Sequence, residues 1–157
     1  MAIKIGETLK LNHLLLDIAQ NEIGVKEIPG KENNPRILEY ARGAGLNWVK
    51  NDETSWCGIF MGWLFSEIPE TLRPDYPKEK AATAREWMKY GTEVDLAEAQ
   101  FGDVVVFWRK SPQSWKGHVG LYMGRHGDDV LCLGGNQNGQ VSISNFDVEK
   151  ILSIHRT

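Results

Sequence analysis

The stretch that decides the fold reads Trp56-Cys57-Gly58-Ile59-Phe60-Met61-Gly62-Trp63-Leu64-Phe65. Its apolar side chains run almost all the way round a helix, a pattern that is typical of a helix buried on every side. Thr54 or Ser55 can cap the first turn, and Pro69 follows the expected end of the helix. We therefore predict a buried helix over residues 56–67.

Three more helices are predicted on the two flanks of this helix. Residues 11–23 carry apolar side chains at helical spacing, at Leu11, Leu14, Leu15, Ile18 and Ala19. Pro35 suits the first turn of a short helix over residues 36–42, which Gly43 ends. Residues 81–90 form the fourth predicted helix, and Gly91 stops it.

After Gly102 the pattern changes to short β-branched or alternating segments separated by Gly, Asn and Asp turns. The predicted strands cover residues 103–109, 118–123, 129–133, 140–146 and 151–156. Helices followed by a meander of strands predict an α+β fold, with N-terminal helices packed on a C-terminal antiparallel sheet of about five strands. A length of 157 residues fits a single domain over residues 1–157.

Composition excludes several classes of function. The formal charge of −3 gives no reason to bind nucleic acid or an anionic membrane. The apolar stretches are too short to span a bilayer, and no secretory signal peptide is visible at the start of the sequence. We therefore expect synthesis in the cytoplasm, with delivery by other means if the target lies outside. The two cysteines, Cys57 and Cys132, could form a disulfide, although a chain of this length needs none.

Cys57 is the first candidate for chemistry, because it opens the predicted buried helix. An arbitrary cysteine is more often a small core residue than a nucleophile. At a helix start, however, free N–H groups and the helix dipole stabilise the thiolate, which is the form that attacks carbonyls. Gly58 leaves space beside the thiol, and the N–H of Cys57 can donate to a developing oxyanion. This position favours a catalytic cysteine.

His118 is the candidate base among four histidines. It follows Gly117 and leads a predicted strand, whereas His13, His126 and His155 lie where solvated surface roles are the default. A histidine held by a strand can take and return a proton, although such a residue is also often merely hydrogen-bonded and half-buried.

Asn136 is the candidate partner that orients the imidazole. It lies in Leu133-Gly134-Gly135-Asn136-Gln137-Asn138, at the end of the strand that follows the one carrying His118. An antiparallel neighbour would bring Asn136 alongside His118. The alternative is turn chemistry, which this Gly- and Asn-rich string also suits.

Four motifs resemble the CHAP family of bacterial and phage cysteine, histidine-dependent amidohydrolases/peptidases. They are Asp52-x-x-x-Trp56-Cys57-Gly58, Phe101-Gly102-Asp103-Val104-Val105-Val106-Phe107, Gly117-His118-Val119-Gly120 and Gly134-Gly135-Asn136-Gln137. The resemblance spans most of the chain from about Leu14 onward. It implies a papain-like fold and an enzyme that cleaves peptidoglycan. By match, it implies that Cys57 is the nucleophile, His118 the general base and acid, and Asn136 the polar third member. Many CHAP domains carry a glutamate near the third position, and this sequence has none over residues 133–139, so a neutral amide would stabilise the imidazolium less.

Further residues are candidates for binding the substrate. Asp52 is the better choice for holding a free amine of a cross-link peptide, and Asn51 more plausibly shapes the loop. Trp56 and Trp115 could form walls of a groove, although Trp56 could equally pack in the core. Asp103 is expected to turn the chain into the first strand, a structural role.

Other chemistries lack their motifs. The sequence contains no phosphate-binding Gly-x-x-x-x-Gly-Lys-Ser/Thr loop, no His-Glu-x-x-His zinc helix and no Gly-x-Ser-x-Gly elbow. A zinc site on Cys57, His118 and Cys132 is disfavoured because no close Cys-x-x-Cys pair is present. We expect no metal and no cofactor.

The sequence therefore predicts a hydrolase that cleaves an amide of the peptidoglycan stem peptide or the muramoyl-L-alanine link through a cysteine acyl-thioester. A phage endolysin released by a holin and a secreted antibacterial effector with an immunity protein are both compatible with it, and we expect a monomer. The alternative is a non-catalytic phage structural or wall-binding module of the same fold, and an intracellular thiol protease is a weaker third possibility.

Overall fold

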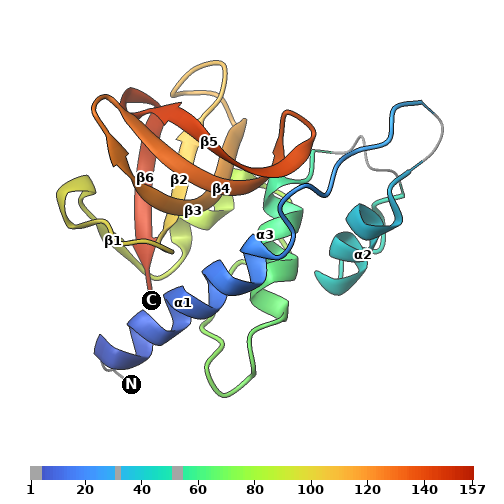
Figure 1. Cartoon of the computed structure of the whole chain (residues 1–157), viewed down its shortest axis with the longest axis horizontal. Helices are drawn as coiled ribbons and strands as arrows, with labels where there is room; N and C mark the ends of the chain where they lie inside the picture. The colour runs from blue at the N-terminus through green and yellow to red at the C-terminus, as the bar shows by residue number, and fades with distance from the viewer. Residues whose placement is uncertain (1–4, 31–32, 51–54) are drawn as a thin grey trace.

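The computed structural model describes residues 5–30, 33–50 and 55–157. Along these residues three α-helices come first, namely α1 (Ile5–Gln20), α2 (Pro35–Gly43) and α3 (Cys57–Ser66). The strands that follow are β1 (Thr92–Val94), β2 (Val104–Trp108), β3 (Gly117–His126), β4 (Asp129–Gln137), β5 (Gln140–Asp147) and β6 (Ile151–Arg156). Short 3-10 helices lie at η1 (Ala84–Lys89), η2 (Leu96–Glu98) and η3 (Val148–Lys150). The predicted α+β class, with helices preceding an antiparallel sheet, is confirmed (Figure 1).

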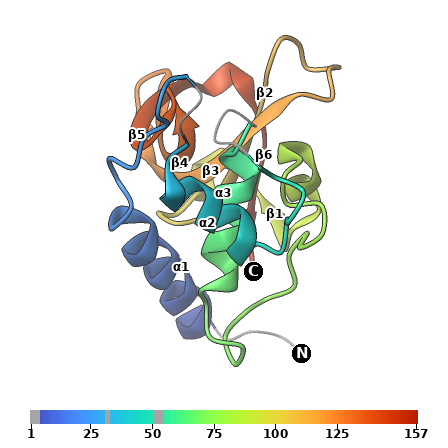
Figure 2. The same ribbon diagram turned by 90° about the vertical axis from the view of Figure 1, so that its right-hand side faces the viewer.

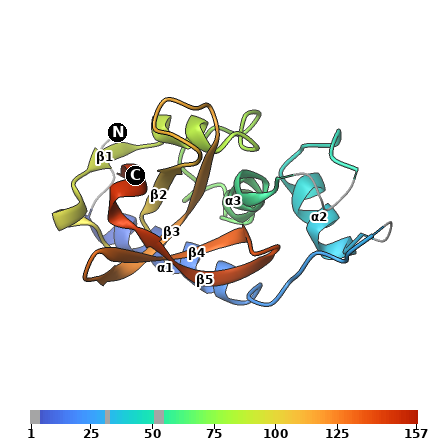
Figure 3. The same ribbon diagram turned by 90° about the horizontal axis from the view of Figure 1, so that it is seen from above.

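α3 is the central helix of the molecule. Every residue from Cys57 to Phe65 is buried, as its apolar run predicts. The helix packs on β3 and β4 on one side and on α2 on the other, which Figure 3 shows from above. α1 also contacts α3 and presents Leu11, Leu15 and Ala19, which recur every four residues and are buried.

The sheet has six strands in the order β1-β6-β2-β3-β4-β5, and all its pairings are antiparallel. Alternate residues cover its two faces. The face toward α3 carries Val104, Val106, Val119, Leu121 and Leu133. The other face carries a smaller apolar cluster of Val105, Phe107, Tyr122, Val130, Cys132 and Ile154.

Several elements differ from the sequence-based expectation, and the largest differences are at β1 and over residues 81–90. β1 was not predicted, because its three residues pair only with β6 at the sheet edge and are mostly exposed. The predicted helix over residues 81–90 is wrong in type, since the structure has the 3-10 helix η1 there. The buried residues of this segment, Ala81, Ala84, Trp87 and Tyr90, recur every three positions, and this period matches a 3-10 helix rather than an α-helix.

Candidate active site

Cys57 is the first residue of α3. The N-cap is Trp56, with φ −121° and ψ 14°, and no side chain caps the helix. The predicted capping role of Ser55 is therefore wrong, and Thr54 lies outside the described residues. As a result, the first N–H groups of α3 are available to the sulfur of Cys57 and to a bound carbonyl oxygen.

His118 stands near the start of β3, close enough to Cys57 for the two side chains to shift each other's pKa values. The ring stacks on Phe146, with centroids 5.0 Å apart and an interplanar angle of 15°, and on Phe107 at 6.2 Å. Cys57 is 3% exposed and His118 is 6% exposed. The structure thus brings together the two side chains that the sequence proposes as nucleophile and base.

The pKa values of the pair shift in opposite directions. Burial by itself would raise the pKa of Cys57, but the charge of His118 and hydrogen bonds from its ring and from the N–H groups of Val119 and Gly58 lower it. Burial would likewise lower the pKa of His118, but the charge of the Cys57 thiolate and hydrogen bonds with the sulfurs of Cys132 and Cys57 raise it. The favoured resting form is therefore a thiolate–imidazolium pair.

The side chain hydrogen-bonded to the His118 ring is that of Gln137, whereas the sequence places Asn136 there. Gln137 is 4% exposed, and its Oε1 lies 2.9 Å from Nε2 of His118. Asn136 is half-buried and has a φ of +56°. Of these two neighbours, it is the Gln137 amide that contacts the imidazole.

A β-bulge explains why the neighbour of the expected residue takes this place. Gly134 pairs with Ser142 of β5, and Gln137 pairs with Gln140, so three steps along β4 match two along β5. Strict alternation would place Asn136 on the face of Cys132 and Gly134, where His118 lies. The extra residue shifts this alternation by one, and Asn136 absorbs the shift in the left-handed region that Asn tolerates.

The hydrogen bonds of Gln137 determine which nitrogen of His118 carries the proton. Its amide nitrogen Nε2 donates to the carbonyl oxygens of Cys132 at 3.1 Å and Ser142 at 2.7 Å. Both N–H groups are thereby engaged, so the oxygen Oε1 faces His118 and accepts a hydrogen bond from the N–H at Nε2 of the ring. Nδ1 is left as the ring nitrogen that can take the proton of the Cys57 thiol.

The residues predicted to bind the substrate differ in where they lie. Asp52 and Asn51 lie outside the described residues. Trp56 is 1% exposed and its indole nitrogen donates to Glu27 at 2.8 Å, so it packs in the core, as one of its two interpretations anticipated. Trp115 is 74% exposed and lines a cavity beside Cys57, which suits a groove wall.

Asp103 has the structural role expected of it. It is 1% exposed and accepts hydrogen bonds from the side chains of Asn12 and Arg156 and from the N–H of Gln100. These contacts join α1, β6 and the turn before β2.

Two cavities open beside the Cys57–His118 pair. One, of about 540 Å³, is lined by Cys57, Trp115 and Lys116 among others. The second, of about 560 Å³, is lined by His118, Asn136 and Gln137 among others. Arg109 and Lys110 line both cavities, so the loop between β2 and β3 is their shared wall. Figure 2 shows this loop at the end of the molecule where α3 begins.

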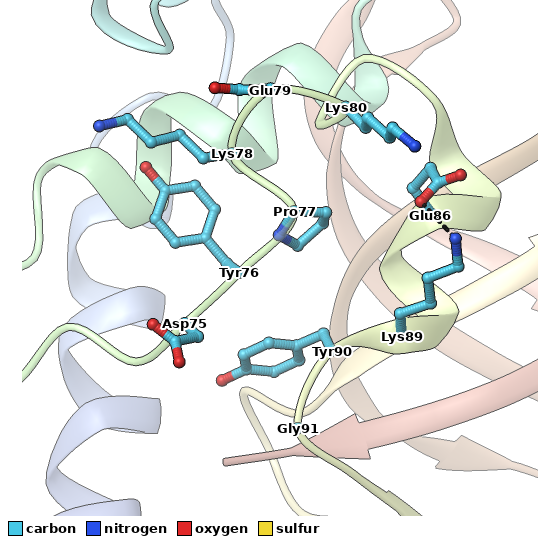
Figure 4. A pocket seen from close by; sticks show the side chains of 10 residues that line it. All are labelled: Asp75, Tyr76, Pro77, Lys78, Glu79, Lys80, Glu86, Lys89, Tyr90 and Gly91. Atoms are coloured by element: carbon cyan, nitrogen blue, oxygen red, sulfur yellow. Dashed lines mark hydrogen bonds and ion pairs between the residues drawn. The ribbon is translucent and has the colours of Figure 1, made fainter.

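A further cavity, of about 620 Å³, is of another kind (Figure 4). Tyr76 and Tyr90 line it together with charged side chains of both signs, and neither a cysteine nor a histidine is among its lining residues. It therefore offers no nucleophile of the Cys57 type.

Residues 5–30, 33–50 and 55–157 contain no group of three His, Cys, Asp or Glu side chains able to hold a metal ion. Over the same ranges, no helix combines the length and apolar character that crossing a bilayer requires. Cys57 and Cys132 are both free thiols.

The sequence reasoning missed the residues that build the loop beside the thiol. Arg85 of η1 donates to the carbonyl oxygens of Lys116 at 2.8 Å, Pro112 at 2.8 Å and Ser111 at 3.0 Å. Arg85 lies outside this loop in the sequence, so no local sequence pattern could indicate these hydrogen bonds. The sequence feature that could have drawn attention to this loop is its group of basic residues near Trp115, namely Arg109, Lys110 and Lys116.

Comparisons with known proteins find a match to one family model and similarity in fold to solved structures. The model of the NlpC/P60 family matches residues 40–151. Among solved structures, the P60 domain of antigen MAP1272c from Mycobacterium avium paratuberculosis is 16% identical with a TM-score of 0.56, covering 97% of this chain and 96% of that chain. The peptidoglycan hydrolase RipB (Rv1478) from Mycobacterium tuberculosis is 19% identical with a TM-score of 0.57, covering 98% of this chain and 68% of that one. No curated protein matches the chain significantly.

The comparisons bear out the broader part of the sequence resemblance. At these identities the solved structures show the fold, and the papain-like α+β prediction is confirmed. The family model that matches is that of NlpC/P60, and it does not support CHAP specifically.

Proposed function

Because the chain belongs to the NlpC/P60 family, we propose that it is a peptidoglycan hydrolase that cleaves an amide bond through an acyl-thioester on Cys57. The observation that carries the proposal is the buried Cys57–His118 pair at the start of α3, with Gln137 behind the ring and two cavities beside it. The printed description of RipB as a peptidoglycan hydrolase supports the choice of substrate.

The first half of the reaction forms the thioester. The Cys57 thiolate attacks the carbonyl carbon of the amide. N–H groups at the start of α3 donate hydrogen bonds that stabilise the negative charge developing on the carbonyl oxygen. His118 then gives its Nδ1 proton to the leaving nitrogen as the carbon–nitrogen bond breaks. Gln137 keeps the ring in the required orientation, because its carbonyl oxygen accepts from Nε2 throughout.

The second half releases the acyl group. His118, now neutral, takes a proton from a water molecule at Nδ1, and the resulting hydroxide attacks the thioester carbonyl. The carbon–sulfur bond breaks, which returns the thiolate and the imidazolium. We propose that these steps take place at the bacterial cell wall, where an endolysin or a secreted effector would act.

Purified sacculi provide the test. We expect the wild-type protein to lower their turbidity and to release muropeptides, and Cys57→Ala to do neither. Mass spectrometry of the released products identifies the bond: a free muramic acid carboxyl indicates an amidase, whereas shortened stem peptides indicate an endopeptidase. Undiminished lysis by Cys57→Ala would refute the proposal.

Thiol labelling distinguishes the hydrolase from a non-catalytic wall-binding module. In the native protein at mildly acidic pH, a catalytic Cys57 is expected to react rapidly with an alkylating agent while Cys132 stays protected. Equal and slow labelling of both cysteines would favour the binding module.

A further inference from the structure

The two cavities beside Cys57 and His118 are positively charged in an acidic protein. Arg109 and Lys110 line both, Lys116 lines the cavity of Cys57 and Lys150 that of His118. Among the described residues that line either cavity, none is Asp or Glu. The whole chain nevertheless carries a formal charge of −3. Basic side chains are therefore concentrated where the substrate is expected to bind.

Arg109 and Lys110 are exposed and are not neutralised by neighbours in the described structure. The ion pairs found over residues 5–30, 33–50 and 55–157 use other basic side chains, namely Arg36, Lys89 and Arg156. The side-chain hydrogen bonds found over the same ranges likewise involve neither Arg109 nor Lys110. Lys116, by contrast, lies over the ring of Trp115, with its Nζ 5.8 Å from the centroid.

The loop that carries Arg109 and Lys110 is held in place before any substrate binds. The guanidinium of Arg85 donates hydrogen bonds to three backbone carbonyl oxygens of this loop, at distances of 2.8 to 3.0 Å. Lys110 has a φ of +67°, an unusual value for a residue other than glycine, at the point where the loop turns away from β2. An ordered loop presents its charges at lower entropic cost than a flexible one.

We propose that Arg109 and Lys110 bind a carboxylate of the wall peptide that flanks the amide bond to be cleaved. This inference rests on the proposed hydrolase function and adds a specificity-determining site to it. A peptide that extends from the cavity of Cys57 to that of His118 must pass the two side chains that both cavities share. The planar fork of Arg109 matches a carboxylate, and the ammonium of Lys110 adds a second positive charge.

The experiment compares two synthetic stem peptides that differ only in whether the flanking carboxyl group is a free carboxylate or a carboxamide. The wild-type protein is expected to cleave the carboxylate form with a kcat/KM about 10- to 100-fold higher, the range of a charge-assisted hydrogen bond. In the double variant Arg109→Gln/Lys110→Gln this ratio should fall toward one, because cleavage of the carboxylate peptide is lost selectively.

Lys78→Gln/Lys80→Gln is the matched control. This variant also removes two positive charges, but from the cavity of Figure 4, where acidic side chains are present as well. This control should retain the wild-type ratio. A ratio that survives in Arg109→Gln/Lys110→Gln, or a wild-type protein that cleaves both peptides equally, would overturn the proposed carboxylate site and leave the hydrolase intact.

Binding to Cys57→Ala separates this failure from a failure of the hydrolase itself. If the wild-type protein cleaves neither peptide, the proposed function fails, and calorimetric titration of Cys57→Ala with both peptides decides the binding site independently. Tighter binding of the carboxylate peptide, abolished by Arg109→Gln/Lys110→Gln, would support the site. Equal binding of the two peptides would reject it.

Discussion

The two cysteines of this protein share one histidine and nevertheless differ. Cys57 and Cys132 are both buried and both free, and both lie close enough to His118 for its ring to influence their pKa values. The pKa of Cys57 is lowered, whereas that of Cys132 is raised, chiefly by burial. A neighbouring imidazole is therefore not sufficient to make a thiolate.

The backbone around each sulfur accounts for the difference. Cys57 begins α3, where the N–H groups of Gly58 and Val119 donate to its sulfur. Cys132 lies in the middle of β4, in the apolar cluster on the other face of the sheet. Moreover, the negative charge of Cys57 raises the pKa of Cys132, so ionisation of the first disfavours ionisation of the second.

Replacing each cysteine in turn tests this comparison with the largest expected effect. Cys57→Ala should lower kcat on wall peptides by about 10⁴-fold or more, because it removes the nucleophile. Cys132→Ala should leave kcat within a few-fold, because this sulfur is neither the nucleophile nor the group that orients the His118 ring. Rates are measured on the same muropeptides, and circular dichroism checks that both variants fold. Comparable losses in the two variants would contradict the distinction between them.

Removing the shared histidine tests how much it contributes to the pKa of Cys57. His118→Ala is expected to lower kcat/KM by about 10²- to 10⁴-fold, the contribution of a general acid–base group. Its second effect is on Cys57, whose pKa should rise because the charge and the hydrogen bond that lower it are gone. The rate of alkylation of Cys57 against pH measures this pKa directly.

The pH profile of the wild-type protein gives the sign of each titration. As pH rises through the lowered pKa of Cys57 the thiolate forms and activity appears. As pH rises further, through the raised pKa of His118, the imidazolium proton is lost and activity declines. In His118→Ala, alkylation should begin at higher pH than in the wild type. An unchanged alkylation profile would show that the helix start alone sets the pKa of Cys57.

The sequence predicted the framework of this site better than its details. The five predicted strands, the buried helix and the Cys57–His118 pair follow from periodicity and from residue type at element ends. The identity of the third residue did not follow, because the bulge at Asn136 depends on how β4 pairs with β5. The loop held by Arg85 was missed for a similar reason, since its contacts join segments distant in sequence.

Two neighbouring amides allow the bulge to be tested. Gln137→Ala should lower kcat/KM by about 10- to 100-fold, because His118 loses the acceptor that orients its ring while the carbonyl oxygens of Cys132 and Ser142 lose their donor. Asn136→Ala should cost no more than a few-fold. Gln137→Glu is the informative third variant, since a carboxylate there accepts from His118 but cannot donate to the carbonyl oxygens. A larger loss of kcat/KM in Asn136→Ala than in Gln137→Ala would instead support Asn136 as the residue that orients the His118 ring.

The smallest expected effect concerns the packing of Cys132. A Cβ at Gly120 would lie 2.4 Å from Sγ of Cys132 and 2.9 Å from the carbonyl oxygen of Leu133, so Gly120→Ala overpacks the strand beside the second cysteine. We expect it to lower the free energy of unfolding by about 1–3 kcal/mol, measured by denaturant titration. Combining it with Cys132→Ala should recover part of this loss, because the nearest clashing atom is removed while the backbone oxygen remains. If the two substitutions were simply additive, the sulfur would not be the atom that limits space at Gly120, and the role of Cys132 as a packing residue would lose its support.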